Sequence, residues 1–406
     1  MKKYKIGFGW IGEGNRQGLS LLLALLTFAM ALVGCGGSAP APEEPAAKTQ
    51  APAEDATQEE SADGQEPAAT SDRCGDKSKL ADTLNFFNWS DYIDEDILTQ
   101  FEEKCGVKVV QDMFSSNEDM IAKIQTGNSG YDLVVPSDYA IEIMVNRDML
   151  AELDTSNIPN MKNLNPKLMG LYYDPDNKYS LPYQWGTTGI AYNVNEFPEP
   201  PDSWAVLFDF DQVCKHSGFV SMLDDEREAL GAALMYLGYS PNDTDPEHHK
   251  EAKKLLLGQK NCLAAYDSDN FANTLASEEI YLANSWSGGV ATARAENENI
   301  AYFIPKEGGV IWQDNLAIPS DAPNKYTAEV FINYLLDPEI GAQLTNYTYY
   351  FTPNKESEAL LDQEYYELLE SGGMLVDDEI YSRLKWIKRN NKSMIFSDTW
   401  TGVKAQ

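Results

Sequence analysis

Two kinds of hydrophobic spacing alternate along the chain before residue 140. Apolar runs typical of strands occupy residues 84–89, 107–114 and 131–135, and stretches with helical spacing lie between them at 95–104 and 118–125. Strands that alternate with helices in this way are typical of βαβ units, with a mostly parallel sheet and helices on both faces. The pattern therefore predicts an α/β fold.

The alternation resumes in a second block, from residue 191 to about residue 305. Strand-like runs are predicted there at 218–223, 263–266 and 280–286, and helices are predicted beyond it at 327–336, 338–345 and 362–369. Two such blocks in a chain of 406 residues, 43% of them hydrophobic, predict two lobes with sizeable cores.

The first 34 residues have the layout of an export signal. Lys2, Lys3 and Arg16 precede an uncharged, mostly apolar run from 19 to 34. This run is shorter than the ~20 residues that a membrane span needs, and it ends in small residues. The tripeptide before Cys35 resembles the lipobox of bacterial lipoproteins, which predicts that Cys35 is lipidated. The alternative is an ordinary signal peptide with an incidental cysteine.

Residues 35–73 are predicted to be this lipidated cysteine and a disordered tether. From Gly36 to Arg73 the chain consists mainly of Ala, Pro, Glu, Gln, Ser and Thr, without an aromatic residue. Such a segment cannot bury enough apolar surface to fold. The folded part is thus expected to lie close to the membrane, outside the cytoplasm.

The chain is strongly acidic. It has 31 Lys and Arg against 64 Asp and Glu, a net charge of −33. Such a surface repels nucleic acid and anionic lipid and attracts cations. Acidity that serves solubility alone is the other explanation.

Four further cysteines favour disulfides over a metal site. An even number is expected to pair in an exported protein. Proximity along the chain favours Cys74 with Cys105 and Cys214 with Cys262 among the three pairings that four cysteines allow. There is no CxxC spacing and only three histidines, so neither a metal nor a cofactor is predicted.

Polar and aromatic residues follow two of the predicted strands, at 88–92 and 136–139. In open α/β sheets ligands bind beyond the carboxyl ends of the strands. These two segments are therefore expected to line a ligand site.

Five phrases in order carry a resemblance to a known family. They read FNWSDY at 87–92, YDLVVPS at 131–137, LPYQWG at 181–186, DDERE at 224–228 and PKEGG at 305–309. Between Leu84 and Asn354 the chain resembles the spermidine/putrescine-binding proteins of bacterial ABC transporters.

This resemblance implies a two-lobe periplasmic-binding-protein fold of type II, with a hinge between the lobes and the ligand in the cleft between them. The chain would cross between the lobes near 188–193 and 313–316. One lobe would comprise residues 82–188 and about 315–354, and the other about 192–312 and 355–406.

The resemblance also implies a polyamine pocket. Aromatic faces suit both the methylenes and the ammonium groups of a polyamine, and carboxylates accept hydrogen bonds from its cationic amines. The implied aromatic walls are Trp89, Tyr92, Tyr139, Trp286, Trp312 and Tyr350. The implied polar contacts are Ser90, Ser137, Asp225, Glu228 and Asp314.

Asp225 and Glu228 stand three residues apart at the start of a predicted helix, which places both carboxylates on one face near favourable backbone dipoles. A solvated acidic helix cap is the alternative interpretation of this pair.

Two positions bear on which polyamine the pocket prefers. Putrescine-specific members of the family have an acid three residues after the equivalent of Trp286, where this chain has Gly289. Together with Trp312, this favours a pocket of the spermidine type, with putrescine as the second candidate. The glutamine that spermidine receptors carry in the C-terminal region has no match near Trp386 and Ile387.

The sequence thus predicts a monomeric, lipid-anchored binding protein in the periplasm or at the cell surface, and no enzyme. Its partners would be a polyamine and the permease of an ABC importer with a cytoplasmic ATPase. A binding protein for a different cationic solute remains an alternative, since the fold alone does not fix the ligand. A secreted glycoside hydrolase with two catalytic carboxylates is a second alternative.

Overall fold

The computed structural model describes residues 73–388 and 392–405. The predicted export signal, Cys35 and all of the predicted tether except Arg73 lie outside the described residues. Arg73 was wrongly assigned to the tether. Its guanidinium donates to the two carboxylate oxygens of Asp337 at 2.8 and 2.9 Å, so it belongs to the folded part.

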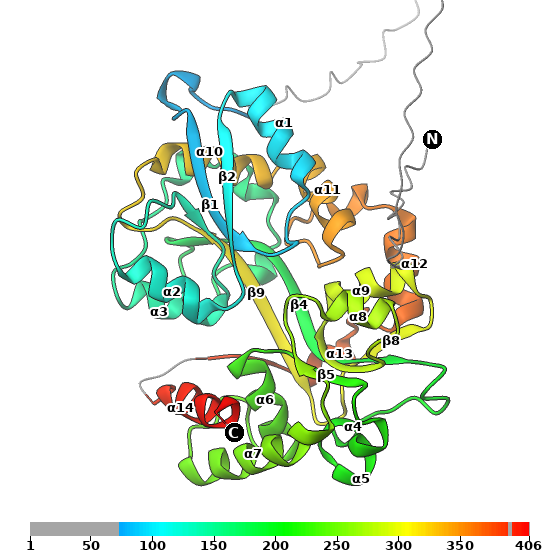
Figure 1. Cartoon of the computed structure of the whole chain (residues 1–406). Helices are drawn as coiled ribbons and strands as arrows, with labels where there is room; N and C mark the ends of the chain where they lie inside the picture. Colours follow the sequence, from blue (N-terminus) through cyan, green and yellow to red (C-terminus); the bar gives the residue numbers. More distant parts are fainter. Residues whose placement is uncertain (1–72, 389–391, 406) are drawn as a thin grey trace, which may run out of the picture. The chain divides into compact units, whose positions relative to one another are not determined.

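The strands of the described residues join into one ten-stranded sheet (Figure 1). They are β1 Thr83–Trp89, β2 Lys108–Phe114, β3 Leu133–Val134, β4 Ser180–Asn193, β5 Val220–Met222, β6 Ala265–Tyr266, β7 Leu282–Trp286, β8 Ile300–Phe303, β9 Gly309–Ala317 and β10 Leu384–Trp386. The order is β2-β1-β3-β9-β4-β7-β5-β6, with β10 beside β9 and β8 beside β4.

The sheet is mixed, so the predicted parallel pairing holds only in part. Parallel pairing is found for β1 with β2 and β3, for β5 with β6 and β7, and for β10 with β9. The long strands β4 and β9 are antiparallel to each other and pair from Ser180 opposite Ala317 to Thr188 opposite Val310, with a shift of register between Pro182 and Gln184. They carry the chain between the two groups of elements in opposite directions, as Figure 1 shows, which makes an antiparallel pair unavoidable.

The first group of elements begins with the βαβ units that the sequence predicts. Asp94 caps the first helix by accepting from the Asp96 amide at 3.0 Å, and Gly106 ends it at a φ of 77°. Its buried face packs Phe101 against Phe331, with ring centroids 4.8 Å apart. The helices of this group are α1 Glu95–Cys105, α2 Asn117–Gln125, α3 Asp138–Val145, α10 Lys325–Leu335 and α11 Pro338–Thr348.

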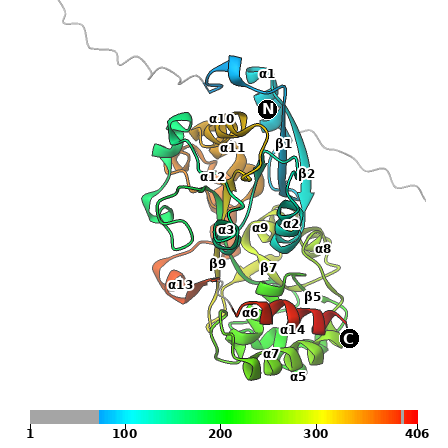
Figure 2. The ribbon, with the colours of Figure 1, turned by 90° about the vertical axis from the view of Figure 1, so that its left-hand side faces the viewer.

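The second group surrounds β5, β6 and β7 and includes the C-terminal helices. Figure 2 shows the last helix, α14, lying along α6 and α7. The helices are α4 Ala205–Phe208, α5 Phe210–Val213, α6 Glu226–Tyr236, α7 Pro246–Gln259, α8 Phe271–Ala276, α9 Ser287–Glu296, α12 Gln363–Gly372, α13 Asp378–Arg383 and α14 Met394–Lys404.

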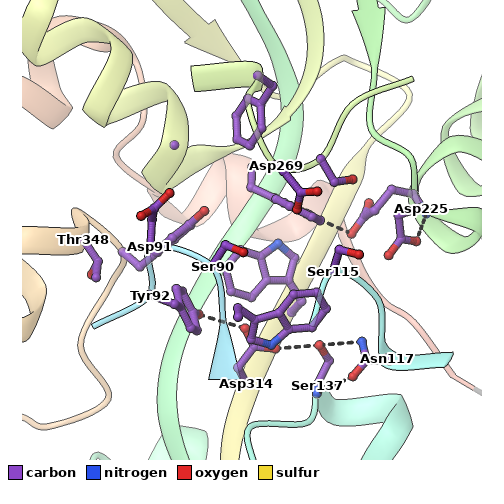
Figure 3. A pocket seen from close by; sticks show the side chains of 18 of the residues that line it. Ser90, Asp91, Tyr92, Ser115, Asn117, Ser137, Asp225, Asp269, Asp314 and Thr348 are labelled. Carbon is purple, nitrogen blue, oxygen red and sulfur yellow. Dashed lines mark hydrogen bonds between the residues drawn. The ribbon is translucent and has the colours of Figure 1, made fainter. Parts of the chain in front are cut away.

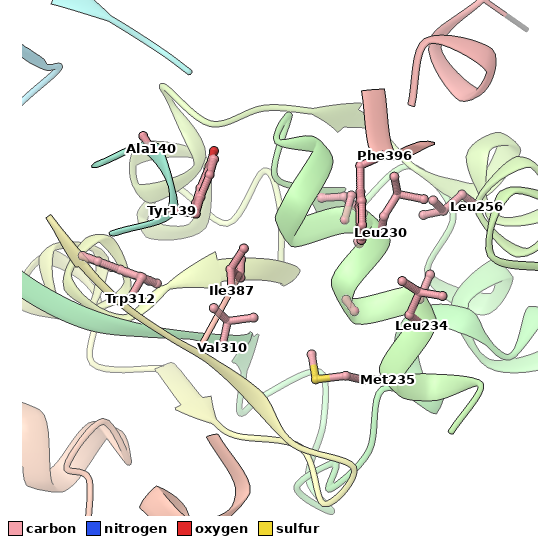
Figure 4. Packing of buried hydrophobic residues seen from close by; sticks show 14 of the residues in the cluster. Tyr139, Ala140, Leu230, Leu234, Met235, Leu256, Val310, Trp312, Ile387 and Phe396 are labelled. Atoms are coloured by element: carbon pink, nitrogen blue, oxygen red, sulfur yellow. The ribbon is translucent and has the colours of Figure 1, made fainter. Parts of the chain in front are cut away.

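One hydrophobic cluster extends from the second group to the centre of the molecule. Figure 4 shows Leu230 and Leu234 of α6 beside Phe396 of α14, with Ile387 and Trp312 towards the sheet. The C-terminal helix therefore covers α6 and contributes to the core that supports the centre.

The four cysteines of the described residues form two disulfides, Cys74 with Cys105 and Cys214 with Cys262. This is the pairing that proximity along the chain favours. The first disulfide ties the segment before β1 to the end of α1.

Candidate ligand-binding cleft

A cavity of about 470 Å³ lies between the two groups of elements, within the range typical of small-molecule sites (Figure 3). All of the predicted binding residues line it, namely Trp89, Ser90, Tyr92, Ser137, Tyr139, Asp225, Glu228, Trp286, Trp312, Asp314 and Tyr350.

The strand ends place these side chains around one space. Trp89 is the last residue of β1, Trp286 is the last residue of β7, and Ser137 comes three residues after the end of β3. The indole nitrogen of Trp89 donates to the Val135 carbonyl at 2.9 Å, which fixes the ring beside β3. The rule that ligand sites lie beyond the carboxyl ends of strands thus holds here.

Asp314 on β9 is the centre of a polar network. One of its carboxylate oxygens accepts from the Tyr92 hydroxyl at 2.8 Å, and the other accepts from the Ser137 hydroxyl at 2.6 Å. Asn117 holds Ser137 in place through its side-chain nitrogen, which donates to that hydroxyl at 3.0 Å. Ser137 occupies the N-cap of α3 without making a side-chain cap, because its hydroxyl serves Asp314 instead.

Asp314 is only 6% exposed, and burial raises its pKa to about 6, although the hydrogen bonds from Ser137 and Tyr92 oppose the shift. A buried carboxylate of this kind favours a cationic partner.

Asp225 and Glu228 form a second acidic centre at the start of α6. Asp225 is the N-cap, and its Oδ1 accepts from the amides of Arg227 and Glu228 at 2.7 and 3.0 Å. The two acids are only 7% and 5% exposed, so the alternative of a solvated cap is wrong. Burial comes from α6 facing the cavity, a tertiary effect that helical spacing alone does not determine.

The carboxyl group of Glu228 is poorly satisfied. The Trp286 indole nitrogen approaches one oxygen at 3.5 Å, and the other, Oε2, is buried without a hydrogen-bond partner among the described residues. Burial and, next, the neighbouring Asp225 raise the pKa of Glu228 to about 8. Burial likewise raises the pKa of Asp225.

Aromatic rings wall the space between the two acidic centres. The ring centroids of Trp89 and Trp286 lie 6.3 Å apart, and Tyr350 lies 5.3 Å from Trp312 and 5.2 Å from Tyr92. These edge-to-face contacts leave ring faces available to a ligand.

Two glycines at the start of α9 make room for this wall. A Cβ atom at Gly288 would come within 2.4 Å of the Tyr350 ring, and one at Gly289 within 2.3 Å of the Phe271 ring. Phe271 in turn packs edge-to-face against Trp286, 5.9 Å between centroids. Any side chain at position 289 would therefore displace the ring that supports Trp286.

Several wall residues were not predicted from the sequence. Asp91 and Asp138 lie in the segments 88–92 and 136–139, which were expected to line a ligand site, but neither was named as a binding residue, although their charge was a usable signal. Arg227 lies between two predicted acids. No local signal identifies Ile387. It lies far beyond β9 in the sequence, and it reaches the cavity because β10, which ends at Trp386, pairs with β9. The further unpredicted wall residues include Asp269, Thr348 and Tyr347.

The charge of the cavity is strongly negative. Its wall has six acidic residues, Asp91, Asp138, Asp225, Glu228, Asp269 and Asp314, and one basic residue, Arg227. The guanidinium of Arg227 stacks at 3.8 Å on the Phe396 ring and donates to Asn242 and to the Lys388 carbonyl. This cavity is suited to hold an elongated, partly apolar cation.

In the parts of the chain that the structure describes, no three or more His, Cys, Asp or Glu side chains are grouped so that they could hold a metal ion. Within the same residues no helix has both the length and the apolar character to cross a membrane.

A family model for bacterial extracellular solute-binding proteins matches residues 96–367. The chain belongs to this family. The family consists of solute-binding transport proteins, so the glycoside hydrolase alternative is wrong, and the place of action is outside the cytoplasmic membrane.

Individual relatives of this solute-binding protein are similar over most of its length. It is 36% identical to a putrescine/cadaverine-binding protein of Pseudomonas aeruginosa, over 81% of this chain and 95% of the relative. It is 40% identical to a spermidine/putrescine-binding periplasmic protein of Escherichia coli, over 70% of this chain and 80% of the relative. Among solved structures, a lipoprotein of Treponema pallidum aligns with a TM-score of 0.68 at 31% identity, over 80% of this chain and all of the other.

Proposed function

We propose that this solute-binding protein captures a linear polyamine and delivers it to the permease of an ABC importer. The observation that carries the proposal is the pair of buried acidic centres, Asp314 and Asp225 with Glu228, in one cavity with aromatic walls between them. The names of the Pseudomonas and Escherichia relatives support the same ligand class.

Each part of a polyamine has a counterpart in the wall of the cleft. A buried carboxylate is costly unless it meets a cation that also donates hydrogen bonds. An ammonium group donates up to three, and each charge-assisted bond stabilises a complex by about 1.5–3 kcal/mol. The methylenes between two ammonium groups would lie against the rings, at about 0.8 kcal/mol for each one buried.

Spermidine is the expected preferred ligand. Position 289 has no acidic side chain, and the contact of Gly289 with the Phe271 ring leaves no room for one. Trp312 is held by a hydrogen bond from its indole nitrogen to the Thr188 hydroxyl at 3.1 Å, which keeps a broad ring on the cavity wall. Putrescine, with two ammonium groups in place of three, would leave one of the three buried carboxylates of Asp225, Glu228 and Asp314 without an ammonium partner.

We further propose that the protein is a lipid-anchored monomer whose two lobes close over the ligand. The two lobes, residues 82–188 with about 315–354 and about 192–312 with 355–406, would close over the ligand about β4 and β9. Lipidation at Cys35 would keep the monomeric protein at the membrane. An intact mass of the exported protein that shows an unmodified thiol at Cys35 would contradict the anchor.

Calorimetric titration of the ligand-free protein with spermidine tests the function. Binding at micromolar concentration or tighter is expected. Absence of binding to both spermidine and putrescine would favour the alternative of a different cationic solute.

A further inference from the structure

A second cavity, of about 290 Å³, lies beside the cleft. The two cavities share four wall residues, among them Asp225 and Asp269, so they are contiguous. Figure 3 places Asp225 on the side of the cleft opposite to Asp91 and Thr348. We call this second cavity the acidic annex.

Carboxylates dominate the annex. Seven of its twelve wall residues are Asp or Glu, and none is Lys, Arg or His. They come from both groups of elements, with Glu118 and Asp119 at the start of α2 facing Asp224, Glu226 and Asp267. Acidic side chains on opposite walls of one space concentrate cations there.

The chain itself places an ammonium group at the edge of the annex. Lys404, near the end of α14, pairs with Asp224 at 2.7 Å between Nζ and Oδ2. The same Nζ lies 5.1 Å from the centre of the Tyr266 ring and 5.6 Å from that of Trp400, and the two rings pack edge-to-face. A carboxylate with two aromatic rings is the same set of groups that the main cleft offers.

Polar groups on the annex wall also lack partners. Asp225 is 7% exposed and lines both cavities, and among the described residues only its Oδ1 accepts hydrogen bonds. The hydroxyls of Tyr266 and Ser268 are buried without a hydrogen-bond partner in the described part of the chain. Two buried hydroxyls in this condition, beside the Asp225 carboxylate, indicate a ligand that forms hydrogen bonds.

We propose that the acidic annex is an outer ammonium subsite, which accepts the fourth ammonium group of a linear tetraamine whose other groups occupy the main cleft. Lys404 acts there as a tethered competitor, because its ammonium group already pairs with Asp224 and the two rings. The inference rests on the proposed polyamine function and extends it to ligand length. A triamine ends within the main cleft and does not reach the annex.

Three variants of the full mature chain test this subsite by titration with spermidine and with spermine. Lys404→Met removes the competitor and keeps an apolar stem, so spermine affinity should rise several-fold while spermidine affinity stays constant. Asp267→Asn retains an acceptor for the turn amides that Asp267 now caps, at 3.0 and 2.9 Å, and removes one annex charge. It should weaken spermine binding by about tenfold and leave spermidine unchanged.

Lys250→Met is the matched control, since Lys250 is an exposed lysine of α7 that pairs only with the exposed Glu247 in the described structure. If Lys404→Met changes the affinities for spermine and spermidine by the same factor, as Lys250→Met would through net charge, the subsite is refuted. The function itself is tested separately, because its failure would abolish spermidine binding to the unmodified protein.

Discussion

Asp225 has two roles in this structure, and substitutions can separate them. Its Oδ1 caps α6 through the amides of Arg227 and Glu228, and its charge contributes to the acidic centre of the cleft. Replacement by Ala removes both. Loss of an N-cap costs about 0.5–2 kcal/mol of stability, and loss of a charge-assisted contact costs about 1.5–3 kcal/mol of binding, roughly ten- to a hundredfold in affinity.

Asp225→Asn should lose only the second role. An Asn oxygen caps a helix about as well as an Asp oxygen, so the free energy of unfolding should stay within about 0.5 kcal/mol of the original or rise, because a buried charge is removed. Spermidine affinity should still fall at least tenfold.

Urea unfolding and calorimetric titration of both variants measure the two quantities separately. If Asp225→Asn binds spermidine as tightly as the unmodified protein, the carboxylate does not contact the ligand, and the assignment of this acidic centre is refuted. If Asp225→Ala and Asp225→Asn are equally unstable, the capping role is wrong.

Three further predictions concern protonation, the hydrogen bond to Asp314 and the disulfides. The pKa of Glu228 is raised to about 8 from an ordinary 4.5, so the ligand-free protein should lose stability as the pH rises from about 5 to 8. Because spermidine binds the ionised carboxylate, binding should release protons, and spermidine affinity should rise from pH 6 to pH 8. Calorimetric titration in two buffers of different ionisation enthalpy detects the released protons, and equal heats in both buffers would contradict the claim. Tyr92→Phe keeps the ring but removes the hydroxyl that donates to Asp314 at 2.8 Å. Spermidine affinity should fall about three- to tenfold with little change in the free energy of unfolding, and an unchanged affinity would contradict a role for Asp314. The two disulfides close separations of 31 and 48 residues, so the loss of each by reduction should lower the free energy of unfolding by about 3–4 kcal/mol. Urea unfolding with and without reductant measures this difference, and coincident unfolding curves would contradict the prediction.

Much of the architecture was predictable because local spacing determines it. The runs at 84–89, 95–104 and 107–114 became β1, α1 and β2 with ends shifted by only one residue, since their apolar faces pack on one sheet. The antiparallel β4 and β9 were not predicted, because each is a nearly continuous buried run whose direction depends on where the chain returns.

The cleft was predictable only in part, for a similar reason. The resemblance named residues that line one cavity, yet it gave no burial for Asp225 and no reason to include Ile387. The burial of Asp225 and the position of Ile387 depend on contacts between residues far apart in the sequence. These contacts are the packing of α14 on α6 and the pairing of β10 with β9.

The most direct test of the polyamine function is calorimetric titration of the unlipidated chain from Gly36 onward, after removal of bound ligand by refolding, with spermidine and then putrescine. We predict micromolar or tighter binding of spermidine and weaker binding of putrescine, with proton release near neutral pH. A folded protein that binds neither amine would contradict the account.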